Sequence, residues 1–479
     1  MSSEAPPETA EPKATAVALG ANYWKLWVAS VISNLGDGVA QIAYPWLASA
    51  VTRDPLLIAI IAVVQRLPWL LFTLPAGVIT DRVDRRKIMV SMDVFRMLIT
   101  LGVAFAVAAR ASGLPSPGEI AGGIDIGTNT SLYLVLVVAA LLFGMAEVLR
   151  DNAAQTILPA IVEPEGLEKA NGRLWGAELV ANSFAGPPLG SVLIAVLFAL
   201  PFFVDAGTFA VAAGLVFLIS GDFRTKKVDT GKVEWRKEIS EGFGWLWRHP
   251  LLRPMAIILG LLNGLGMVTF ATLVLFAQEV LNVDAFAFAL LMTAGAFGGV
   301  IGSVAASSIS ERIGSGASLF AVLVASVVTT TVIGLSSWWP VVWVMFAFFT
   351  FTAVLWNVIT VSLRQTIIPD ELLGRVNSVY RFFAWGMMPI GLFVGGLIVA
   401  GTELFTSRGL ALRMPWFVAA AAYVVLAAYA APKLTTEKIE TARAEGIAAK
   451  AGAGPDMDGL ADDAIGESGI AGAPPPVDD

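Results

Sequence analysis

The sequence predicts an all-α membrane protein that crosses the membrane twelve times, as two six-helix pseudo-repeats with both termini in the cytoplasm. The mean hydropathy is +0.74, and hydrophobic residues make up 56% of the 479 positions. Charged residues make up only 14% of the chain, whereas soluble domains carry about 25%. Apolar runs of about 20 residues, the length that crosses a bilayer as a helix, recur along the whole chain. These runs are continuous and do not alternate, which favours helices over the strands of a β-barrel.

The connections between the apolar runs indicate the orientation. Lys and Arg gather in every second connection, whereas the opposite connections hold only Arg53, Arg110, Arg408 and Arg413. Because cytoplasmic loops are enriched in Lys and Arg, this bias places both termini in the cytoplasm. The twelve predicted helices occupy residues 24–50, 56–80, 88–111, 131–158, 168–197, 199–220, 252–280, 285–307, 316–336, 339–366, 377–402 and 409–432.

A polar segment divides the predicted helices into two sets of six. Within it Trp235, Ile239, Phe243 and Leu246 recur at helical spacing, which predicts an amphipathic helix. Such a helix either lies on the inner membrane surface or docks on the protein, and the pattern fits both. The predicted segments are a disordered N-terminal segment (1–20), an N-terminal six-helix bundle (21–220), a cytoplasmic linker (221–251), a C-terminal six-helix bundle (252–432) and a cytoplasmic, largely disordered tail (433–479).

The composition argues against several classes of function. The chain has no Cys and a single His, His249, so we predict no disulfide and no metal site. It contains no glycine-rich loop of the kind that cradles nucleotide phosphates, which argues against direct use of ATP. The net charge is −7, with acidic residues concentrated near the C-terminus, and gives no basis for nucleic-acid binding. We therefore expect neither an enzyme nor a bound cofactor.

The two sets of six helices repeat weakly. The fifth predicted helix of the first set opens with KANG (169–172), and that of the second set opens with RVNS (375–378). Each then carries a proline and a glycine two residues apart, PLG (188–190) and PIG (389–391). Two parallel six-helix repeats are a plan found in transporters, whose binding site lies near the middle of the membrane between the repeats.

The stretch GVITDRVDRRK (77–87) resembles the loop 2–3 signature of the major facilitator superfamily, G-x3-D-R-x-G-R-R-K, with Asp84 in place of the usual glycine. SNLGDG (33–38), DNAAQTILPAIV (151–162) and GPPLG (186–190) resemble one branch of that superfamily, the bacterial proton-coupled drug, macrolide and enterobactin exporters. The resemblance covers residues 20–432. It implies the major facilitator fold in the cytoplasmic membrane of a bacterium.

The resemblance also implies a function. It implies a secondary active transporter that exports amphipathic small molecules, either drugs or siderophore-like compounds, by proton antiport with alternating access. The implied partners are the small-molecule substrate, protons and membrane lipids, with a monomeric protein and no cofactor beyond the proton gradient. Two alternatives stay open: an uptake symporter or facilitator on the same fold, and a lipid-handling or non-transporting membrane protein.

The resemblance assigns a gating role to the charged loop. Asp81 is expected at the N-terminus of predicted helix 11, where the helix dipole stabilises an anion, as a latch in the outward-open state. Asp93 and Arg96 lie one turn apart on predicted helix 3 and are expected to extend this network. The predicted gate residues are Gly77, Asp81, Arg82, Arg85, Arg86, Asp93 and Arg96.

Ionisable residues within spanning helices are costly and usually mark substrate or proton pathways. We predict that Asp37 in helix 1 is the main proton carrier, with Arg150 or Arg66 as its cationic partner. The alternative is a fixed ion pair that pins helices 1 and 4 together. Asp205 is expected only to cap or anchor the outer start of helix 6. The predicted proton-coupling residues are Asp37, Glu147, Arg150 and Asp151.

The remaining candidates concern the substrate cavity and a kinked helix. The second half has few polar residues in its helices and is expected to supply an apolar and aromatic wall. Gly186, Pro187 and Gly190 predict a kinked helix 5, typical either of antiporters or of ordinary close packing. The predicted cavity residues are Asn34, Gln41, Gln65, Arg66, Asn263, Asn357 and Trp385.

Overall fold

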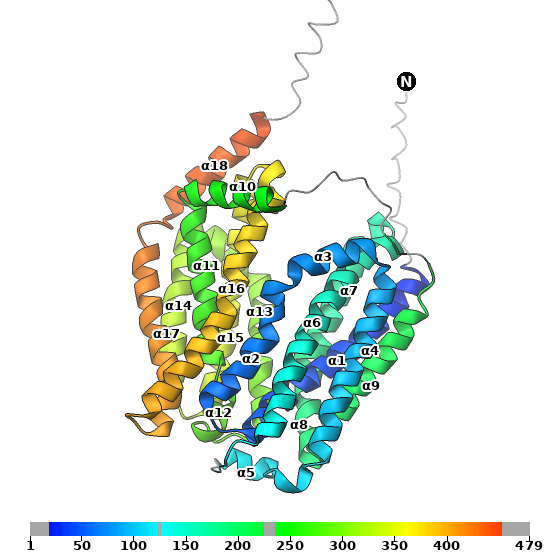
Figure 1. Ribbon diagram of the computed structural model, residues 1–479. Coiled ribbons are helices and arrows are strands. Elements are labelled where there is room, and N and C mark those ends of the chain that lie inside the picture. The colour runs from blue at the N-terminus through cyan, green and yellow to red at the C-terminus, as the bar shows by residue number, and fades with distance from the viewer. Residues whose placement is uncertain (1–18, 123, 125, 222, 225–234, 453–479) are drawn as a thin grey trace, which may run out of the picture.

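The computed structural model describes residues 19–122, 124, 126–221, 223–224 and 235–452, without the side chains of 74, 78, 81, 235–239 and 452. The expectation of disorder at the two termini therefore lies mostly outside the described residues. The described chain is all-helical and contains no strand. Figure 1 shows the helices gathered into two bundles that stand side by side.

The first bundle contains the elements that precede the linker. They are α1 (Gly20–Val51), α2 (Pro55–Leu71), α3 (Thr73–Arg82), α4 (Arg85–Ala108), α5 (Pro117–Ala121), α6 (Thr130–Ile161), α7 (Leu167–Glu178), α8 (Gly186–Val196) and α9 (Leu200–Phe217). The linker helix is α10 (Trp235–Arg248), where the sequence predicts an amphipathic helix.

The second bundle follows the linker helix. Its elements are α11 (Leu252–Phe270), α12 (Leu273–Glu279), α13 (Ala285–Ile313), α14 (Ser315–Leu335), α15 (Trp339–Ile367), α16 (Asp370–Glu403), α17 (Arg408–Ala430) and α18 (Thr436–Gly452). The helix α18 begins in the segment that we assigned to a largely disordered tail. Residues 436–452 are rich in Ala, Glu and Lys, which are strong helix formers.

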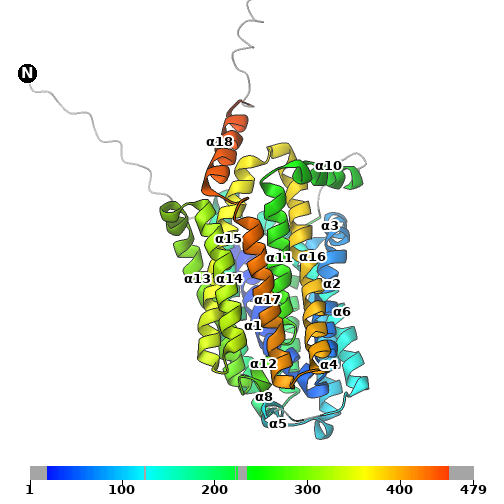
Figure 2. The same cartoon turned by 90° about the vertical axis from the view of Figure 1, so that its left-hand side faces the viewer.

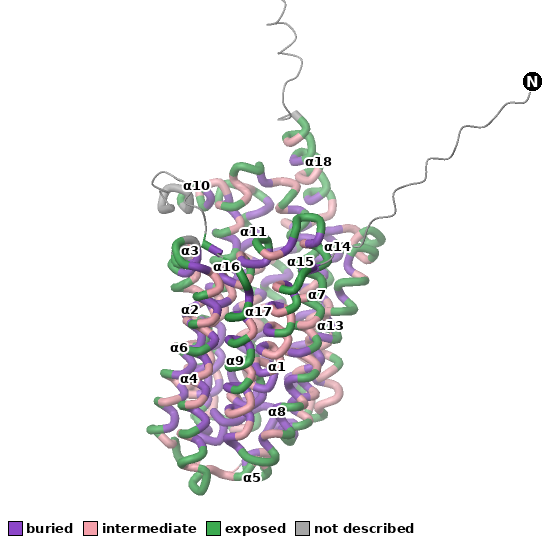
Figure 3. Tube along the Cα trace, turned by 90° about the vertical axis from the view of Figure 1, so that its right-hand side faces the viewer, coloured by how far each residue is buried: buried purple, intermediate pink, exposed green. Residues whose placement is uncertain are grey.

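In the described residues, ten helices are long and apolar enough to cross a membrane. Large apolar side chains are exposed along these helices, among them Leu98 and Phe105 on α4 and Val304 on α13. Exposed residues run along the outer sides of both bundles in Figure 3. Apolar surface of this extent fits contact with lipid rather than water.

Three of the predicted helices are broken. The helix predicted over 56–80 divides into α2 and α3 at Phe72, and that over 252–280 divides into α11 and α12. Pro75 explains the first break, because it has no N–H to bond the carbonyl group of Leu71. The third broken helix contains a π-helical turn, Leu179–Ala185, between α7 and α8. This turn ends two residues before Pro187, and Pro187 and Pro188 also lack the N–H groups that an unbroken α-helix requires.

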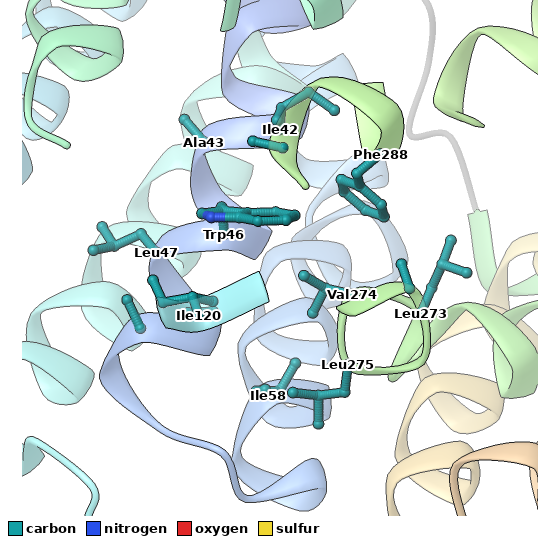
Figure 4. Close-up of a cluster of buried hydrophobic side chains, with 14 of the residues drawn as sticks. Ile42, Ala43, Trp46, Leu47, Ile58, Ile120, Leu273, Val274, Leu275 and Phe288 are labelled. Atoms are coloured by element: carbon teal, nitrogen blue, oxygen red, sulfur yellow. The ribbon is translucent and has the colours of Figure 1, made fainter. Parts of the chain in front are cut away.

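One end of the molecule, which we call the α5 end, holds α5 and α12, and the opposite α10 end holds α10 and α18 (Figures 1 and 2). At the α5 end one buried apolar cluster joins the two bundles. Its members include Trp46 of α1, Ile58 of α2, Leu275 of α12 and Phe288 of α13, and the Trp46 and Phe288 rings lie 5.8 Å apart (Figure 4). The large clusters nearer the α10 end each belong to a single bundle. The shared core therefore closes the α5 end.

The predicted kinked helix packs closely on α1. A Cβ atom added at Gly186 would lie 2.5 Å from Cα of Gly38, and one added at Gly190 would lie 2.7 Å from the carbonyl oxygen of Val39. Pro187 is buried in the same contact region. The absence of side chains at these glycines therefore permits the close approach of α8 to α1.

We expect Gly186→Ala to lower the midpoint of thermal unfolding in detergent, because the added methyl group overlaps the α1 backbone. Overpacking of this kind typically costs about 1–3 kcal/mol. Gly207→Ala on α9 is the matched control, since no atom lies within 4 Å of a Cβ atom there. Equal unfolding midpoints for the two variants would show that the close packing has no effect on stability.

Candidate functional site

A cavity of about 910 Å³ lies in the first bundle and faces the second. Its walls come from α1, α2, α4, α6, α7 and the π-helical turn, and the second bundle contributes only Phe270 and Met292. The cavity extends from Tyr44 on α1 to Leu158 and Asn171, which lie near the α10 end of α6 and α7. It therefore reaches toward the end of the molecule that the shared core leaves open.

A chain of alternating charges runs along this cavity, and all of its members except the buried Asp93 line the wall. Arg96 Nη2 lies 2.5 Å from Asp37 Oδ1, and Arg96 Nη1 lies 3.6 Å from Asp93 Oδ1. The same Asp93 oxygen accepts a hydrogen bond of 3.3 Å from Arg150 Nε, and Arg150 Nη1 lies 3.8 Å from Asp151 Oδ1. The chain links α1, α4 and α6. Two arginines are thus shared among three carboxylates.

The structure corrects the predicted partner of Asp37, which is Arg96 and not Arg150 or Arg66. It also places Arg96 in the centre of the bundle, about three turns into α4 and away from the charged loop. The Arg96 guanidinium is held over the rings of Phe143 and Phe209, at 4.6 and 4.0 Å from their centroids. Burial among aromatic rings and two carboxylates explains how a charged side chain that is only 2% exposed is tolerated here.

The cavity wall carries more acid than base. Glu147, Glu178 and Asp151 line it together with Asp37, whereas its basic residues are Arg66, Arg96 and Arg150. Among the described residues, Glu147 and Glu178 form no ion pair within 4 Å. The wall therefore presents two carboxyl groups that are not matched by a protein cation.

Asp205 differs from its expected place at the outer start of a helix. It lies within α9, one and a half turns from Leu200, and is 1% exposed. A Cβ atom at Gly36 of α1 would lie only 2.4 Å from Asp205 Oδ1, so the side chain points at α1. Thr208 Oγ1 is 3.5 Å from the same oxygen, and Oδ2 has no hydrogen-bond partner in the described part of the chain. The helix starts within one residue of its predicted start, so the correction concerns the side chain of Asp205, which faces α1 and does not cap the helix.

The predicted cavity residues fall into three groups. Asn34, Gln41, Gln65 and Arg66 all line the large cavity, where Gln41 donates to Asn182. Asn263 and Asn357 line a separate cavity of about 120 Å³ within the second bundle, and Asn263 donates to the carbonyl oxygen of Ala384 at 2.8 Å. Trp385 packs edge-on against Trp69, with ring centroids 5.5 Å apart. The structure thus brings together the candidates of the first bundle only.

The charged loop between α3 and α4 is tied to the first bundle. Asp84 Oδ1 accepts from the backbone N–H of Lys87 at 3.1 Å and so caps α4, which gives the residue that replaces the usual glycine a local role. Arg85 donates to the carbonyl oxygen of Thr156, and Arg86 donates to that of Ile219. Arg82 is exposed, and a Cβ atom at Gly77 would meet open space. The side chain of Asp81, the expected latch, lies outside the described part of the structure.

A second charged cluster, which sequence reasoning missed, joins the two bundles at the α5 end. Arg53 Nη2 lies 2.5 Å from Glu279 Oε1, and Arg53 Nη1 donates to Gln278 at 2.6 Å. Arg408 Nε lies 2.5 Å from Glu279 Oε2, and its Nη2 donates to the backbone oxygen of Arg53 at 2.7 Å. We call Arg53, Glu279 and Arg408 the outer cluster. Together with the shared apolar core, it locks the bundles together at this end.

Comparisons with known proteins place this chain in a family. The model of the Major Facilitator Superfamily matches residues 26–392. The multidrug efflux pump Tap of Mycolicibacterium fortuitum is 27% identical over 398 residues, which cover 81% of this chain and 91% of Tap. The enterobactin exporter EntS of Citrobacter koseri is 23% identical over 362 residues, which cover 74% of this chain and 80% of EntS.

Solved structures show the same fold. A bacterial homologue of the iron transporter ferroportin, in its inward-facing state, matches with a TM-score of 0.61 at 17% identity, covering 85% of this chain and 98% of that one. A bacterial homologue of the lysosomal transporter Spinster, also inward-facing, matches with a TM-score of 0.64 at 14% identity, covering 88% and 98%. These relatives are transporters and not enzymes, and the apolar helices with the bacterial relatives indicate a multi-pass protein of the bacterial plasma membrane. The chain belongs to the Major Facilitator Superfamily.

Proposed function

We propose that this protein is a secondary active transporter that exports amphipathic small molecules by proton antiport with alternating access. The observation that carries the proposal is the large cavity whose wall holds Asp37, Arg96, Arg150 and Asp151, with the two arginines linked behind the wall by the buried Asp93. Export, rather than uptake, is supported by the efflux pump and exporter among its relatives. Multidrug and enterobactin relatives together support drugs or siderophore-like compounds as the substrate class.

We propose a twelve-helix topology with both termini in the cytoplasm. The helix α1 and the 17-residue apolar helix α2 would complete the set of ten apolar spans. Because the Lys- and Arg-rich connections lie at the α10 end, that end would face the cytoplasm and the α5 end would face outward. The bundles at 21–220 and 252–432 would then act as the two moving bodies, joined by the linker at 221–251. The transporter would work as a monomer surrounded by lipid.

In this orientation the described conformation would be inward-facing. The shared apolar core and the outer cluster hold the bundles together on the outer side, and the cavity extends toward the cytoplasmic side. Export requires the opposite conformation, in which the outer cluster is broken and the charged loop closes the inner side. Asp81 is proposed as the latch of that second state.

Proton coupling would run through Asp37. Arg96 contacts both Asp37 and Asp93, so protonation of Asp37 would leave Arg96 paired with Asp93 alone. Three atoms of the chain, Asp93 Oδ2, Arg96 Nε and Arg150 Nη2, are buried without a hydrogen-bond partner among the described residues. The cluster therefore has unused hydrogen-bonding capacity with which to rearrange when a proton enters or leaves. Glu147 and Asp151 are proposed to share the proton or to contact the substrate.

Proton movement in liposomes tests the proposed function. The protein is reconstituted with an acidic interior, a pH dye reports the gradient, and ethidium, erythromycin and enterobactin are added in turn. We expect at least one compound to dissipate the gradient in protein-containing liposomes and not in empty ones. If compounds bind, as judged by tryptophan fluorescence, and none moves protons, the antiport proposal is wrong.

A further inference from the structure

A further cavity, distinct from the small one that Asn263 and Asn357 line, lies beside the charged cavity and inside the second bundle. It measures about 220 Å³, and its walls come from α11, α13, α14, α15 and α17. It contains no charged side chain, in contrast to the large cavity. The rings of Phe346, Phe349 and Trp416 form part of its wall.

Most of the hydroxyl groups in this wall are already hydrogen-bonded to the protein, and Thr350 is the exception among the described residues. Thr269 donates to the carbonyl oxygen of Gly266, Thr329 to that of Ala325 and Thr330 to that of Ser326. Tyr423 likewise donates to a backbone oxygen on α11. Because these hydroxyl protons are directed at the backbone, the cavity offers mainly methyl groups and aromatic faces to a ligand. It suits a group that needs no hydrogen bond.

The two cavities meet at two side chains. Phe270 and Met292 line both of them, and among the described residues they are the only ones that the second bundle contributes to the charged cavity. Phe270 is 49% exposed, and methionine is the apolar side chain that adapts most readily to different shapes. A molecule in the charged cavity therefore touches the entrance of the apolar one.

We propose that the apolar cavity binds the ring or short alkyl portion of a substrate whose polar portion lies in the charged cavity. The inference deepens the proposed function and rests on its claim that the charged cavity holds substrate. The first bundle thus binds the polar part of the substrate, and the second bundle binds its apolar part. An engineered apolar cavity of about 150 Å³ binds benzene, so the volume here is sufficient for a six-membered ring.

Binding of matched probe pairs tests this inference. The ring-bearing probes are 4-phenylbutylamine, 4-phenylbutanol and 4-phenylbutanoate, and their ring-free partners are butylamine, butanol and butanoate. Dissociation constants are measured by calorimetry with the full chain in nanodiscs, and heats from empty nanodiscs are subtracted. We expect the ring to tighten binding about tenfold or more for at least one head group, as burial of a phenyl side chain implies.

Filling the apolar cavity with a larger side chain should remove the gain in affinity that the ring provides. Gly295 lines the cavity from α13, and a Cβ atom there would be 3.6 Å from Thr350 Oγ1, so Gly295→Leu places its side chain in the available space. We expect this variant to lose most of the tenfold gain. Gly299→Leu is the matched control, one turn further along α13 and outside the cavity wall, and should keep it. If Gly295→Leu does not fold, Gly266→Leu fills the same cavity from α11.

Three outcomes would overturn the inference. The first is equal affinity for ring-bearing and ring-free probes, and the second is the absence of saturable binding for every probe. The third is that the ring tightens binding in Gly295→Leu and Gly266→Leu as much as in the unaltered protein. A tightly bound phospholipid that native mass spectrometry detects in Gly299→Leu and not in Gly295→Leu would also overturn it, because a lipid chain would then occupy the cavity. Ring-dependent binding without proton movement in liposomes would overturn the proposed antiport and leave this inference standing.

Discussion

Asp37→Asn should lower the rate of proton-driven transport at least about 100-fold, because a positioned proton-transfer group typically contributes a rate factor of that size. Asparagine keeps the size of the side chain and a hydrogen-bond acceptor for Arg96, but it cannot take up or release a proton. Exchange of labelled for unlabelled substrate across the membrane requires no net proton movement, so it should persist in the variant. Both rates are measured in the same liposomes with a compound that the unaltered protein transports.

Glu311→Gln is the matched control for that experiment. It also converts an acid to an amide, but it lies on the exposed final turn of α13, away from the charged cavity. Transport by this variant should equal that of the unaltered protein. Full proton-driven transport by Asp37→Asn would rule out Asp37 as the carrier and favour the alternative, a fixed ion pair with Arg96.

Glu279→Gln should shift the protein from the inward-facing to the outward-facing conformation. Glu279 is 12% exposed and pairs with both Arg53 and Arg408, so the change leaves one buried cation, Arg53, and one partly exposed cation, Arg408, without their shared anion. Loss of one partner from a buried pair typically costs about 3–5 kcal/mol. If the outer cluster breaks in the second state, as proposed, this cost falls on the described conformation alone and corresponds to a change of about 100-fold or more in the equilibrium between the two states.

Distances between spin labels measure this shift, and the chain has no native cysteine to interfere. Ser112→Cys and Leu404→Cys place labels on exposed sites of the two bundles at the α5 end, and Lys169→Cys and Glu371→Cys do so at the α10 end. In the Glu279→Gln background the first distance should lengthen and the second should shorten.

Glu403→Gln is the control for the outer cluster. Glu403 also pairs with Arg408, at 2.7 Å, but both residues belong to the second bundle. Its loss should leave the label distances unchanged. A shift of equal size in Glu403→Gln and Glu279→Gln would mean that the outer cluster does not hold the bundles together.

The helices were predictable from the sequence because each apolar run is long and bounded by charge or proline. The breaks within the helices were harder to predict from the sequence. A proline interrupts the backbone hydrogen bonds at two of the three breaks, but prolines also occur inside unbroken helices. Pro75 and the pair Pro187–Pro188 are visible in the sequence and mark two of the three breaks. No proline marks the break between α11 and α12, and the sequence held no comparable signal there.

The sequence predicted which residues of a single helix line the candidate site, but it did not predict which residues of different helices pair with one another. Asn34, Asp37 and Gln41 recur at steps of three or four residues along α1 and so share one helix face, and all three line the cavity. The pairing of Asp37 with Arg96 depends on how α4 is rotated against α1, which the sequence pattern alone does not specify. A signal existed, however: Arg96 lies deep within an apolar run, where an ionisable group needs a partner from another helix.

The outer cluster was missed for a different reason. Arg53 lies in a loop and Arg408 lies at the start of a helix. The distribution of Lys and Arg between the connections predicts on which side of the membrane they lie, but it does not predict which residue they contact. Arg53 lies 226 residues from Glu279 in the sequence, and Arg408 lies 129 residues from it. Only the packing of one bundle on the other brings them together.

Release of protons on substrate binding is the measurement that tests the central claim most directly. The protein is held in nanodiscs in weakly buffered solution with a pH dye, and a compound that it transports in liposomes is added. If the Asp37–Arg96 site exchanges protons for substrate, the unaltered protein and Glu311→Gln will release protons in proportion to the compound bound, and Asp37→Asn will bind the compound without that release. Equal proton release by all three proteins, or binding by the unaltered protein with no release, would contradict the account.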